Sequence, residues 1–258
     1  QIAWVEYERG RRNVYTASGP GFEPVQLTEY TRDDGRDLGH LRISDDGSVV
    51  AFIRGHEPND EGWIANPSSD PDGGERAVWA AYTTGSREPW KVAEAWNVSL
   101  SPDGEFIAWD QDGQIYRAPV DPGAGERPKR SGAEPLLRVW GDNEDPVWGP
   151  ASRRVAFESQ RGDHDFIGVY DTEERSVTYM APGVDRDLDP TWSPSGSQIA
   201  FVRRPGLPFG RDEERPWWED ETAADTAPAW APDGLFDATF EEGHDLEIWV
   251  ADTETGEG

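Results

Sequence analysis

The chain has 258 residues, of which 52 are Asp or Glu and only 24 are Lys or Arg, so its formal net charge is −28. This surplus of acid excludes the basic footprint that nucleic acids and anionic membranes need in a partner. There is no cysteine to indicate a redox compartment, no apolar run approaches the ~20 residues of a membrane span, and no secretory leader is recognisable.

The acidic residues are spread over the whole chain rather than collected in a tail. In concentrated salt the Debye length falls to ~3 Å, which screens the repulsion within such a surface. The composition therefore favours a halophilic protein, with an ordinary acidic protein as the alternative.

The first half of the chain predicts short β-strands separated by turns. The predicted strands are residues 2–8, 13–17, 24–28, 38–44, 49–54 and 77–82. Between the last two, residues 55–76 are rich in Pro, Asn, Asp and Gly, and we interpret them as an insertion.

The second half continues the same pattern. The predicted strands are residues 96–100, 106–110, 114–118, 135–139, 146–148, 154–159, 166–171, 176–180, 189–192, 199–203 and 246–252. Residues 119–134 are predicted to form a solvated loop, and residues 205–243 a second insertion. Within that insertion, residues 230–234 imitate a repeat turn without a following strand; an extra blade is the alternative.

One turn with its flanking strands recurs along the chain. It is clearest at Ser101-Pro102-Asp103-Gly104, where Pro sets φ, Asp bonds its own backbone and Gly takes the left-handed conformation. The copies are residues 43–52, 100–109, 148–157 and 192–201, and residues 1–4 match the end of a fifth. Spacings of roughly 44 to 57 residues without helical periodicity are typical of β-propeller blades.

The predicted fold is therefore all-β: a β-propeller of four-stranded antiparallel blades, with about five blades or part-blades in a single domain over residues 1–258. Both insertions join second to third strands, so we expect them to project from the same face. The first unit lacks its inner strand and the last its outer one. Because open strand edges are avoided in natural propellers, we expect the protein to extend beyond both ends, with any export leader before Gln1.

The repeats resemble the TolB-type propeller motif. Over a longer range the chain is similar to the N-terminal propeller of bacterial serine peptidases of the prolyl oligopeptidase family, which includes dipeptidyl peptidase IV and acylaminoacyl peptidases. The resemblance rests on Ile2-Ala3-Trp4-Val5, Arg12-Asn13-Val14-Tyr15, Gln26-Leu27-Thr28, Asp33-Asp34-Gly35, Ser159-Gln160-Arg161-Gly162-Asp163-His164, Phe166-Ile167-Gly168-Val169-Tyr170, Phe201-Val202-Arg203-Arg204-Pro205-Gly206 and Ile248-Trp249-Val250-Ala251-Asp252.

The resemblance implies that an α/β-hydrolase domain with a Ser, Asp and His triad follows the propeller. The nucleophile elbow Gly-x-Ser-x-Gly does not occur in this chain, so no catalytic residue is predicted here. The implied role is a non-catalytic propeller segment of a periplasmic or secreted serine peptidase, which gates and positions peptide substrates for its own C-terminal hydrolase domain. The alternatives are a free-standing TolB-like protein-interaction scaffold and, third, a small-molecule enzyme using the propeller channel.

No catalytic, cofactor-binding, metal-binding or substrate-binding residue is assigned from the sequence, and no cofactor is predicted. Family members that remove dipeptides hold the substrate's amino terminus with two propeller glutamates; Glu213-Glu214 is the nearest candidate, but its surroundings do not align, so it receives no role. The histidines follow no metal-binding spacing and are expected in exposed loops, and the acidic cluster near residue 142 is expected to be a solvated turn. These residues are His40, His56, His164 and His244, and Asp142, Glu144 and Asp145.

Two further motifs have structural interpretations. Arg161-Gly162-Asp163 is predicted to be a hairpin turn rather than an adhesion site. Trp148 and Trp192 are predicted to be core rings packed between neighbouring blades. Trp217 and Trp218 either attach the second insertion to the propeller or anchor a partner surface.

Overall fold

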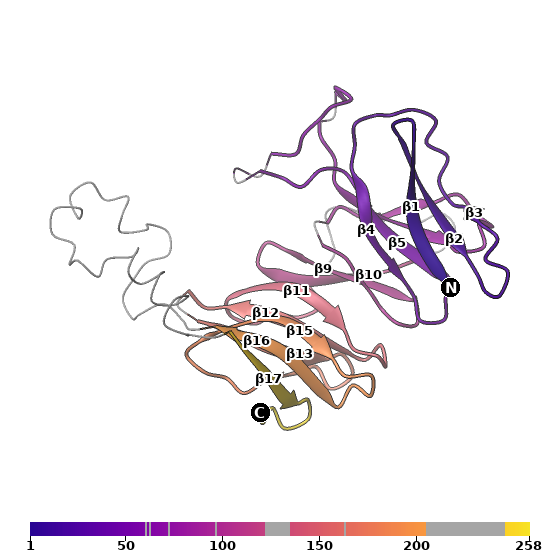
Figure 1. Cartoon of the computed structure of the whole chain (residues 1–258). Coiled ribbons are helices and arrows are strands. Elements are labelled where there is room, and N and C mark those ends of the chain that lie inside the picture. Colours follow the sequence, from indigo (N-terminus) through magenta and orange to yellow (C-terminus); the bar gives the residue numbers. More distant parts are fainter. Residues whose placement is uncertain are drawn as a thin grey trace, which may run out of the picture. The chain divides into compact units, whose positions relative to one another are not determined.

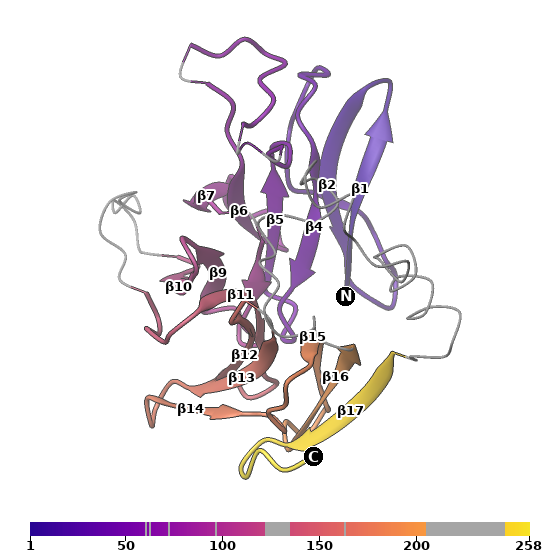
Figure 2. The same cartoon turned by 90° about the vertical axis from the view of Figure 1, so that its left-hand side faces the viewer.

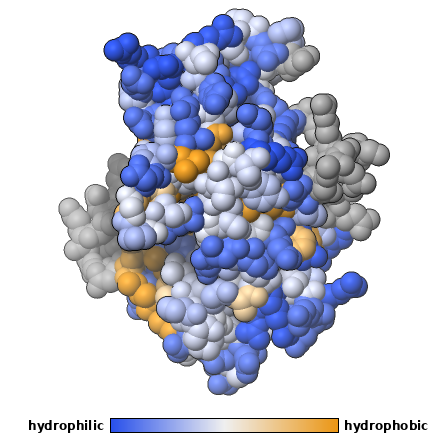
Figure 3. Space-filling model, turned by 90° about the vertical axis from the view of Figure 1, so that its right-hand side faces the viewer, coloured by the Kyte–Doolittle hydropathy of each residue, from blue (hydrophilic) through white to orange (hydrophobic). Residues whose placement is uncertain are grey.

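The structure is a computed structural model that describes residues 1–59, 61, 63–71, 73–95, 97–121, 135–162, 164–204 and 246–258. These residues form β-strands joined by turns, with no helix among them, which confirms the all-β prediction (Figure 1). The described residues accordingly include no helix with the length and apolar character that crossing a membrane requires. The face of the molecule seen in Figure 3 is mostly hydrophilic, with small apolar areas.

The chain divides into two compact units. Residues 1–139 with 144–155 form the first unit, and residues 140–143 with 156–258 form the second. The hairpin of β11 (Asp142–Trp148) and β12 (Arg154–Gln160) supplies residues to both.

The first unit contains three antiparallel sheets whose strands follow chain order (Figure 2). The first sheet is β1 (Ile2–Glu8), β2 (Arg11–Ala17) and β3 (Val25–Gln26). The second is β4 (Leu38–Ile43), β5 (Val49–Arg54), β6 (Ala77–Tyr82) and β7 (Trp90–Ala93). The third is β8 (Ser99–Leu100), β9 (Phe106–Gln111) and β10 (Gln114–Pro119).

The remaining strands form one sheet in the order β11, β12, β13, β15, β16, β17, with β14 beside β13. Their bounds are β13 (Asp165–Asp171), β14 (Ser176–Tyr179), β15 (Arg186–Trp192), β16 (Gln198–Arg204) and β17 (Glu247–Asp252). A single parallel bridge between Asp165 and Arg186 joins β13 to β15, whereas β15, β16 and β17 pair antiparallel. This sheet therefore also consists of meanders of consecutive strands.

The repeated turn has the hydrogen bonds that its sequence predicts. Ser44 Oγ donates to Asp46 Oδ1 (2.6 Å), the Ser48 N–H donates to the same oxygen (2.9 Å), and the Val49 N–H donates to Ser44 Oγ (3.1 Å). Gly47 closes the turn with φ of 70°, a conformation that costs glycine little. A serine, an acid and a glycine thus fix the start of β5.

The same turn recurs between β8 and β9. Ser101 Oγ donates to Asp103 Oδ1 (2.5 Å), and the Phe106 N–H donates to Ser101 Oγ (2.9 Å). Before β16, Ser195 stands where these two turns have Asp, and the Gln198 N–H still donates to Ser193 Oγ (3.1 Å). A serine therefore opens three of the four turns, and in the fourth Gly149 stands at that position.

Consecutive turns of the first unit lie side by side. The Asp45 N–H donates to the Pro102 carbonyl (2.8 Å), and the Asp103 N–H donates to Ser152 Oγ (3.1 Å). These bonds join the turns of three successive repeats, so the strands that follow them begin at the same edge of this unit.

A threonine ties two of these turns to the end of the third strand of their repeat. Thr83 Oγ1, after β6, donates to the Gly47 carbonyl (2.6 Å), and Thr253 Oγ1, after β17, donates to the Gly196 carbonyl (2.8 Å). The same contact therefore occurs in both units, at corresponding points of the repeat.

The carboxylate of Asp46 is expected to stabilise its turn measurably. Hydrogen bonds from Ser44 and Ser48 lower its pKa, and its replacement in Asp46→Ala removes them, at a cost of about 1 kcal/mol at pH 7. A carboxyl whose pKa is lowered on folding stabilises the folded state at pH values above its unfolded pKa. The difference in the free energy of unfolding between wild type and Asp46→Ala should therefore shrink as the pH falls through the folded pKa. Urea unfolding at several pH values measures both effects.

The neighbouring Asp45 provides a control of equal charge change. Its side chain makes no hydrogen bond or ion pair with the part of the chain that the structure describes, and Asp45→Ala keeps the backbone bond to Pro102. Equal losses of stability in Asp45→Ala and Asp46→Ala would contradict a specific role for the Asp46 hydrogen bonds.

Both faces of β5 are buried. Val50 and Phe52 pack with Val14 and Leu27 on one face, and Val49, Ala51 and Ile53 belong to a second cluster that continues through β6 and β9. A strand covered on both faces has an apolar run rather than alternation, as residues 49–53 have.

The second unit has a comparably tight contact between β12 and β13. The ring of Phe157 is fully buried and lies directly over Gly168, where an added Cβ would overlap the ring carbons. Glycine is therefore required at residue 168 by the space that Phe157 occupies.

Several predicted strands differ from the structure. Residues 135–139 form only one bridge, from Pro135 to Tyr116, and the Val139 carbonyl accepts a side-chain donor, Gln114 Nε2 (3.3 Å), so the predicted strand is not present. The predicted strands at 24–28 and 96–100 shorten to Val25–Gln26 and Ser99–Leu100, and β7 was not predicted.

The two tryptophans predicted as core rings have different environments. Trp148 is buried and stacks on Phe106 with ring centroids 6.3 Å apart. Trp192 is only half-buried, so the prediction of a core ring is wrong there; it is followed by the exposed Pro194-Ser195 turn.

The first insertion lies between β5 and β6 as its sequence indicates. The second insertion, with Glu213, Glu214, Trp217, Trp218 and residues 230–234, lies outside the described residues.

Candidate functional site

Two long links meet at one end of the sheet β4–β7. Leu38 begins β4 and pairs with Arg54, which ends β5, so the link into β4 and the insertion after β5 leave the sheet at the same edge. The insertion returns to the sheet at Ala77, where β6 begins. This antiparallel register brings residues 30–37 and 55–76 together.

The insertion has an internal structure of its own. Pro58 and Ile64 form an isolated β-bridge, and Asn59 Oδ1 accepts the Trp63 N–H (2.8 Å). Asn66 holds Asp70 at both backbone groups: its Oδ1 accepts the Asp70 N–H (2.9 Å) and its Nδ2 donates to the Asp70 carbonyl (2.8 Å). Trp63 remains 72% exposed.

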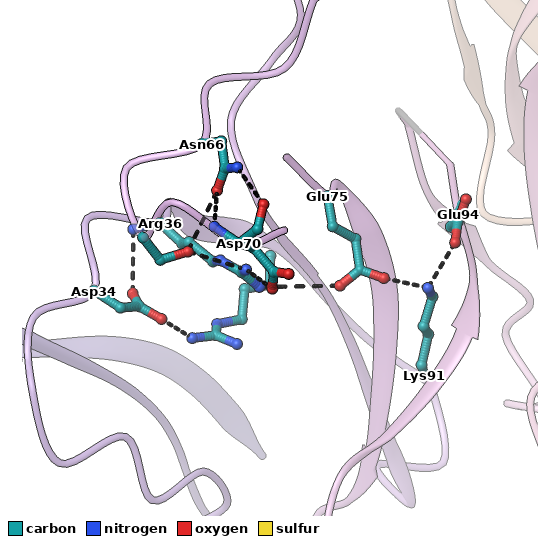
Figure 4. Close-up of polar contacts among 9 residues, drawn as sticks. Asp34, Arg36, Asn66, Asp70, Glu75, Lys91 and Glu94 are labelled. Atoms are coloured by element: carbon teal, nitrogen blue, oxygen red, sulfur yellow. Dashed lines mark hydrogen bonds and ion pairs between the residues drawn. The ribbon is translucent and has the colours of Figure 1, made fainter. Parts of the chain in front are cut away.

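Arg36 attaches the insertion to the preceding link, as Figure 4 shows. Its Nη2 donates to Ser68 Oγ and to Asp70 Oδ2, both at 3.3 Å, and its Nη1 lies 4.0 Å from Glu75 Oε2. Because its side chain is mostly buried, these contacts hold the guanidinium in one place.

The network extends from Glu75 to β7. Lys91 Nζ donates to Glu75 and also to Glu94 Oε1 (2.8 Å) (Figure 4). Burial acts to lower the pKa of Lys91, but its bonds to the two carboxylates raise it above the ordinary value. The lysine therefore stays charged at any physiological pH.

A second ion pair supports the link itself. Asp34 pairs with Arg54 of β5, whose guanidinium carbon lies 3.9 Å from the ring centroid of Tyr30. The Arg36 N–H donates to the other oxygen of Asp34 (3.1 Å), which shapes the turn around Gly35. Burial raises the pKa of Tyr30, so its hydroxyl stays neutral beside the arginine.

A third group of contacts closes the base of the insertion. Arg76, whose side chain is buried, donates to the Gly55 carbonyl (3.1 Å) and to Glu57 Oε1 (3.3 Å). His40 Nε2 lies 3.5 Å from the same Glu57 oxygen. Burial lowers the pKa of Arg76, an effect that Glu57 opposes.

Asp37 binds the second histidine of this region. His56 Nδ1 lies 2.8 Å from Asp37 Oδ2, and Arg12 donates to Asp37 Oδ1 (2.8 Å). Burial acts to raise the pKa of Asp37, but Arg12 and His56 lower it below the ordinary value. Two histidines that are far apart in the sequence thus lie in neighbouring ion-pair groups.

A hollow of about 410 Å³ lies between the link into β4 and the insertion after β5. Its lining consists of Arg32, Asp34, Arg36, Ser68, Ser69, Asp70 and Pro71. Arg32 is exposed and makes no hydrogen bond or ion pair with any residue that the structure describes. The hollow therefore presents one guanidinium that is available to a ligand.

Sequence reasoning missed this hollow. Arg32 and Arg36 flank Asp33-Asp34-Gly35, which was noted only as part of the family resemblance, and Ser68 and Ser69 lie in an insertion without a recognisable motif. The only available signal was the pair of arginines around a turn in a strongly acidic chain.

The other candidate residues are not brought together. His164 packs on Phe166 (ring centroids 4.7 Å apart), Asp145 accepts a bond from Asn97 Nδ2 (2.7 Å), and His244 lies outside the described residues. Within the described ranges there is no group of three or more His, Cys, Asp or Glu placed to hold a metal ion. The Arg161 N–H donates to the His164 carbonyl (2.9 Å), so the predicted hairpin turn is present there, although Asp163 is not described.

No protein-family model matches the sequence, and no curated protein matches it either. A prolyl endopeptidase structure is 11% identical with a TM-score of 0.53, over 98% of this chain and 34% of that one. The tricorn protease is 16% identical with a TM-score of 0.50, over 77% of this chain and 18% of that one. A putative TolB from Agrobacterium tumefaciens is 18% identical with a TM-score of 0.48, over 98% of this chain and 79% of that one.

These likenesses show the fold and not the activity, because the identities are low. The chain has distant structural similarity to the propeller domains of prolyl oligopeptidase-family peptidases and to TolB-like β-propellers. It spans about a third of the prolyl endopeptidase.

Proposed function

We propose that this chain is the non-catalytic β-propeller part of a serine peptidase, in which it gates and positions peptide substrates for an α/β-hydrolase domain of the same protein. The observation that carries the proposal is the structural match to a prolyl endopeptidase over 98% of the chain. The hydrogen-bonded turns of successive repeats support the same architecture, because Asp45 and Asp103 each bind the turn of the next repeat.

The proposed mechanism is steric. A propeller with a narrow axial channel admits extended peptides and excludes folded proteins. The insertion at residues 55–76 is suited to guard an entrance, because Arg36 and Arg76 fix its base while Trp63 remains exposed. A loop held in this way presents a constant obstacle to a large substrate.

The first test is enzymatic and genetic. The purified 258-residue chain should not hydrolyse aminoacyl or dipeptidyl chromogenic substrates, and the gene should encode about 250 further residues with a Gly-x-Ser-x-Gly elbow. In the whole protein, deleting residues 58–73 should speed the cleavage of long or folded substrates more than that of dipeptide substrates. Turnover by the chain alone, or a gene without a hydrolase domain, would contradict the proposal; the latter result would support an interaction scaffold.

A further inference from the structure

We infer that the hollow between residues 32–36 and 68–71 binds the carboxylate group of a peptide. This inference rests on the proposed function for the choice of a peptide as ligand. The observation behind it is an exposed guanidinium, on Arg32, which opens into a hollow of about 410 Å³ and has no partner among the described residues. Ligand sites of small molecules begin at roughly 300 Å³, so one or two amino-acid residues fit.

The charges of the lining favour a ligand with a single negative charge. Asp34 is neutralised by Arg54, and Asp70 is paired with Arg36. Arg32 is then the charged side chain of the lining that has no ion-pair partner among the described residues. A carboxylate balances one such charge, whereas a phosphate dianion would leave a negative charge uncompensated in a chain that is already strongly acidic.

The geometry is also suited to a carboxylate. A guanidinium presents parallel N–H donors that match the two oxygens of a carboxylate. Ser69, next to Ser68 on the opposite wall, can add a hydroxyl donor, because its side chain makes no bond to the described residues. Arg36 is already held by Ser68 and Asp70, so this wall needs no rearrangement when a ligand enters.

The test measures peptide binding to the 258-residue chain by isothermal titration calorimetry at fixed salt. Three N-acetylated alanine tripeptides serve as probes: the free acid, the amide, and an amide with a central glutamate. At least one of the two carboxylate-bearing probes should bind at least tenfold more tightly than the plain amide. The tighter of the two identifies the C-terminal or the side-chain carboxylate as the ligand. Equal binding of all three probes, or tighter binding of inorganic phosphate, would overturn the inference.

Three variants assign the binding to the hollow. Arg32→Gln should weaken the carboxylate probe about tenfold or more, and Arg32→Lys should recover only part of the loss, because lysine keeps the charge without the fork. Arg42→Gln is the control, since it removes the same charge from an exposed residue whose side chain donates only to the Leu41 carbonyl. An equal loss of affinity for the carboxylate probe in Arg32→Gln and Arg42→Gln would show a general charge effect and would overturn the inference.

These measurements need no hydrolase domain. Carboxylate binding that depends on Arg32 would stand even if the gene encoded no peptidase, in which case only the proposed function would fall. Conversely, an active parent peptidase with no carboxylate binding to this chain would keep the function and reject the site.

Discussion

Replacing Phe52 with alanine is expected to lower the free energy of unfolding by about 3–5 kcal/mol. The ring is completely buried in β5 and packs in the cluster that includes Val14, Leu27 and Val50. Alanine removes the transfer free energy of the ring and leaves a cavity that the surrounding strands fill only in part. Urea unfolding followed by tryptophan fluorescence measures the change in the midpoint.

Phe22→Ala is the matched control, because that ring is 51% exposed. It should change stability by well under 1 kcal/mol. A loss in Phe52→Ala no larger than that of the control would mean that the two faces of β5 are not packed as described.

The second large effect is expected at the pair of Arg203 and Asp187. Arg203 Nε and Nη2 donate to the two oxygens of Asp187 at 2.6 and 2.8 Å, and both side chains are almost completely buried. Arg203 also donates to the Ala181 carbonyl (2.6 Å) and lies 4.1 Å from the ring centroid of Trp249. Arg203→Met should cost about 3–5 kcal/mol at pH 7, because it leaves a buried carboxylate without a partner.

The pH dependence identifies the cause of this loss. Burial raises the pKa of Asp187, an effect that the donors of Arg203 oppose, and the bonds to Asp187 raise the pKa of Arg203. Without the arginine only the upward effect on Asp187 remains. A carboxyl whose pKa is raised on folding destabilises the folded state at pH values at which it is ionised, and this cost disappears when it takes up a proton. The loss of unfolding free energy in Arg203→Met should therefore shrink as the pH falls.

Arg204→Met removes the same charge from the exposed neighbour and should change stability by less than about 0.5 kcal/mol. Urea unfolding of both variants between pH 4 and pH 8 makes the comparison. A deficit in Arg203→Met that is constant over this range would contradict an unpaired buried carboxylate as its origin.

The strands were predictable where a local rule decides them. Ser44, Asp46 and Gly47 form a turn by bonding their own backbone, and the apolar run after them forms a strand that is buried on both faces. Residues 135–139 were not predictable, because their apolar run looks like a strand and no residue within it indicates that pairing stops after one bridge. The half-exposure of Trp192 depends on tertiary cover, on which its sequence neighbours give no information.

The candidate site was much less predictable than the strands. It combines residues from two links that are joined only through the antiparallel pairing of β4 and β5. Arg36 and Asp70 meet because that register places both links at one edge, and no motif spans them. The sequence marked the insertion, but the partners within it follow from tertiary structure alone.

The contact between Phe157 and Gly168 constrains the order in which this part of the protein can change. A smaller side chain at residue 157 is accommodated at once, at the cost of a void, whereas any side chain at residue 168 collides with the ring unless the ring has already gone. If side-chain volume moved from one strand to the other in evolution, residue 157 would have to become smaller before residue 168 became larger. The reverse order would pass through a form that is destabilised by this collision.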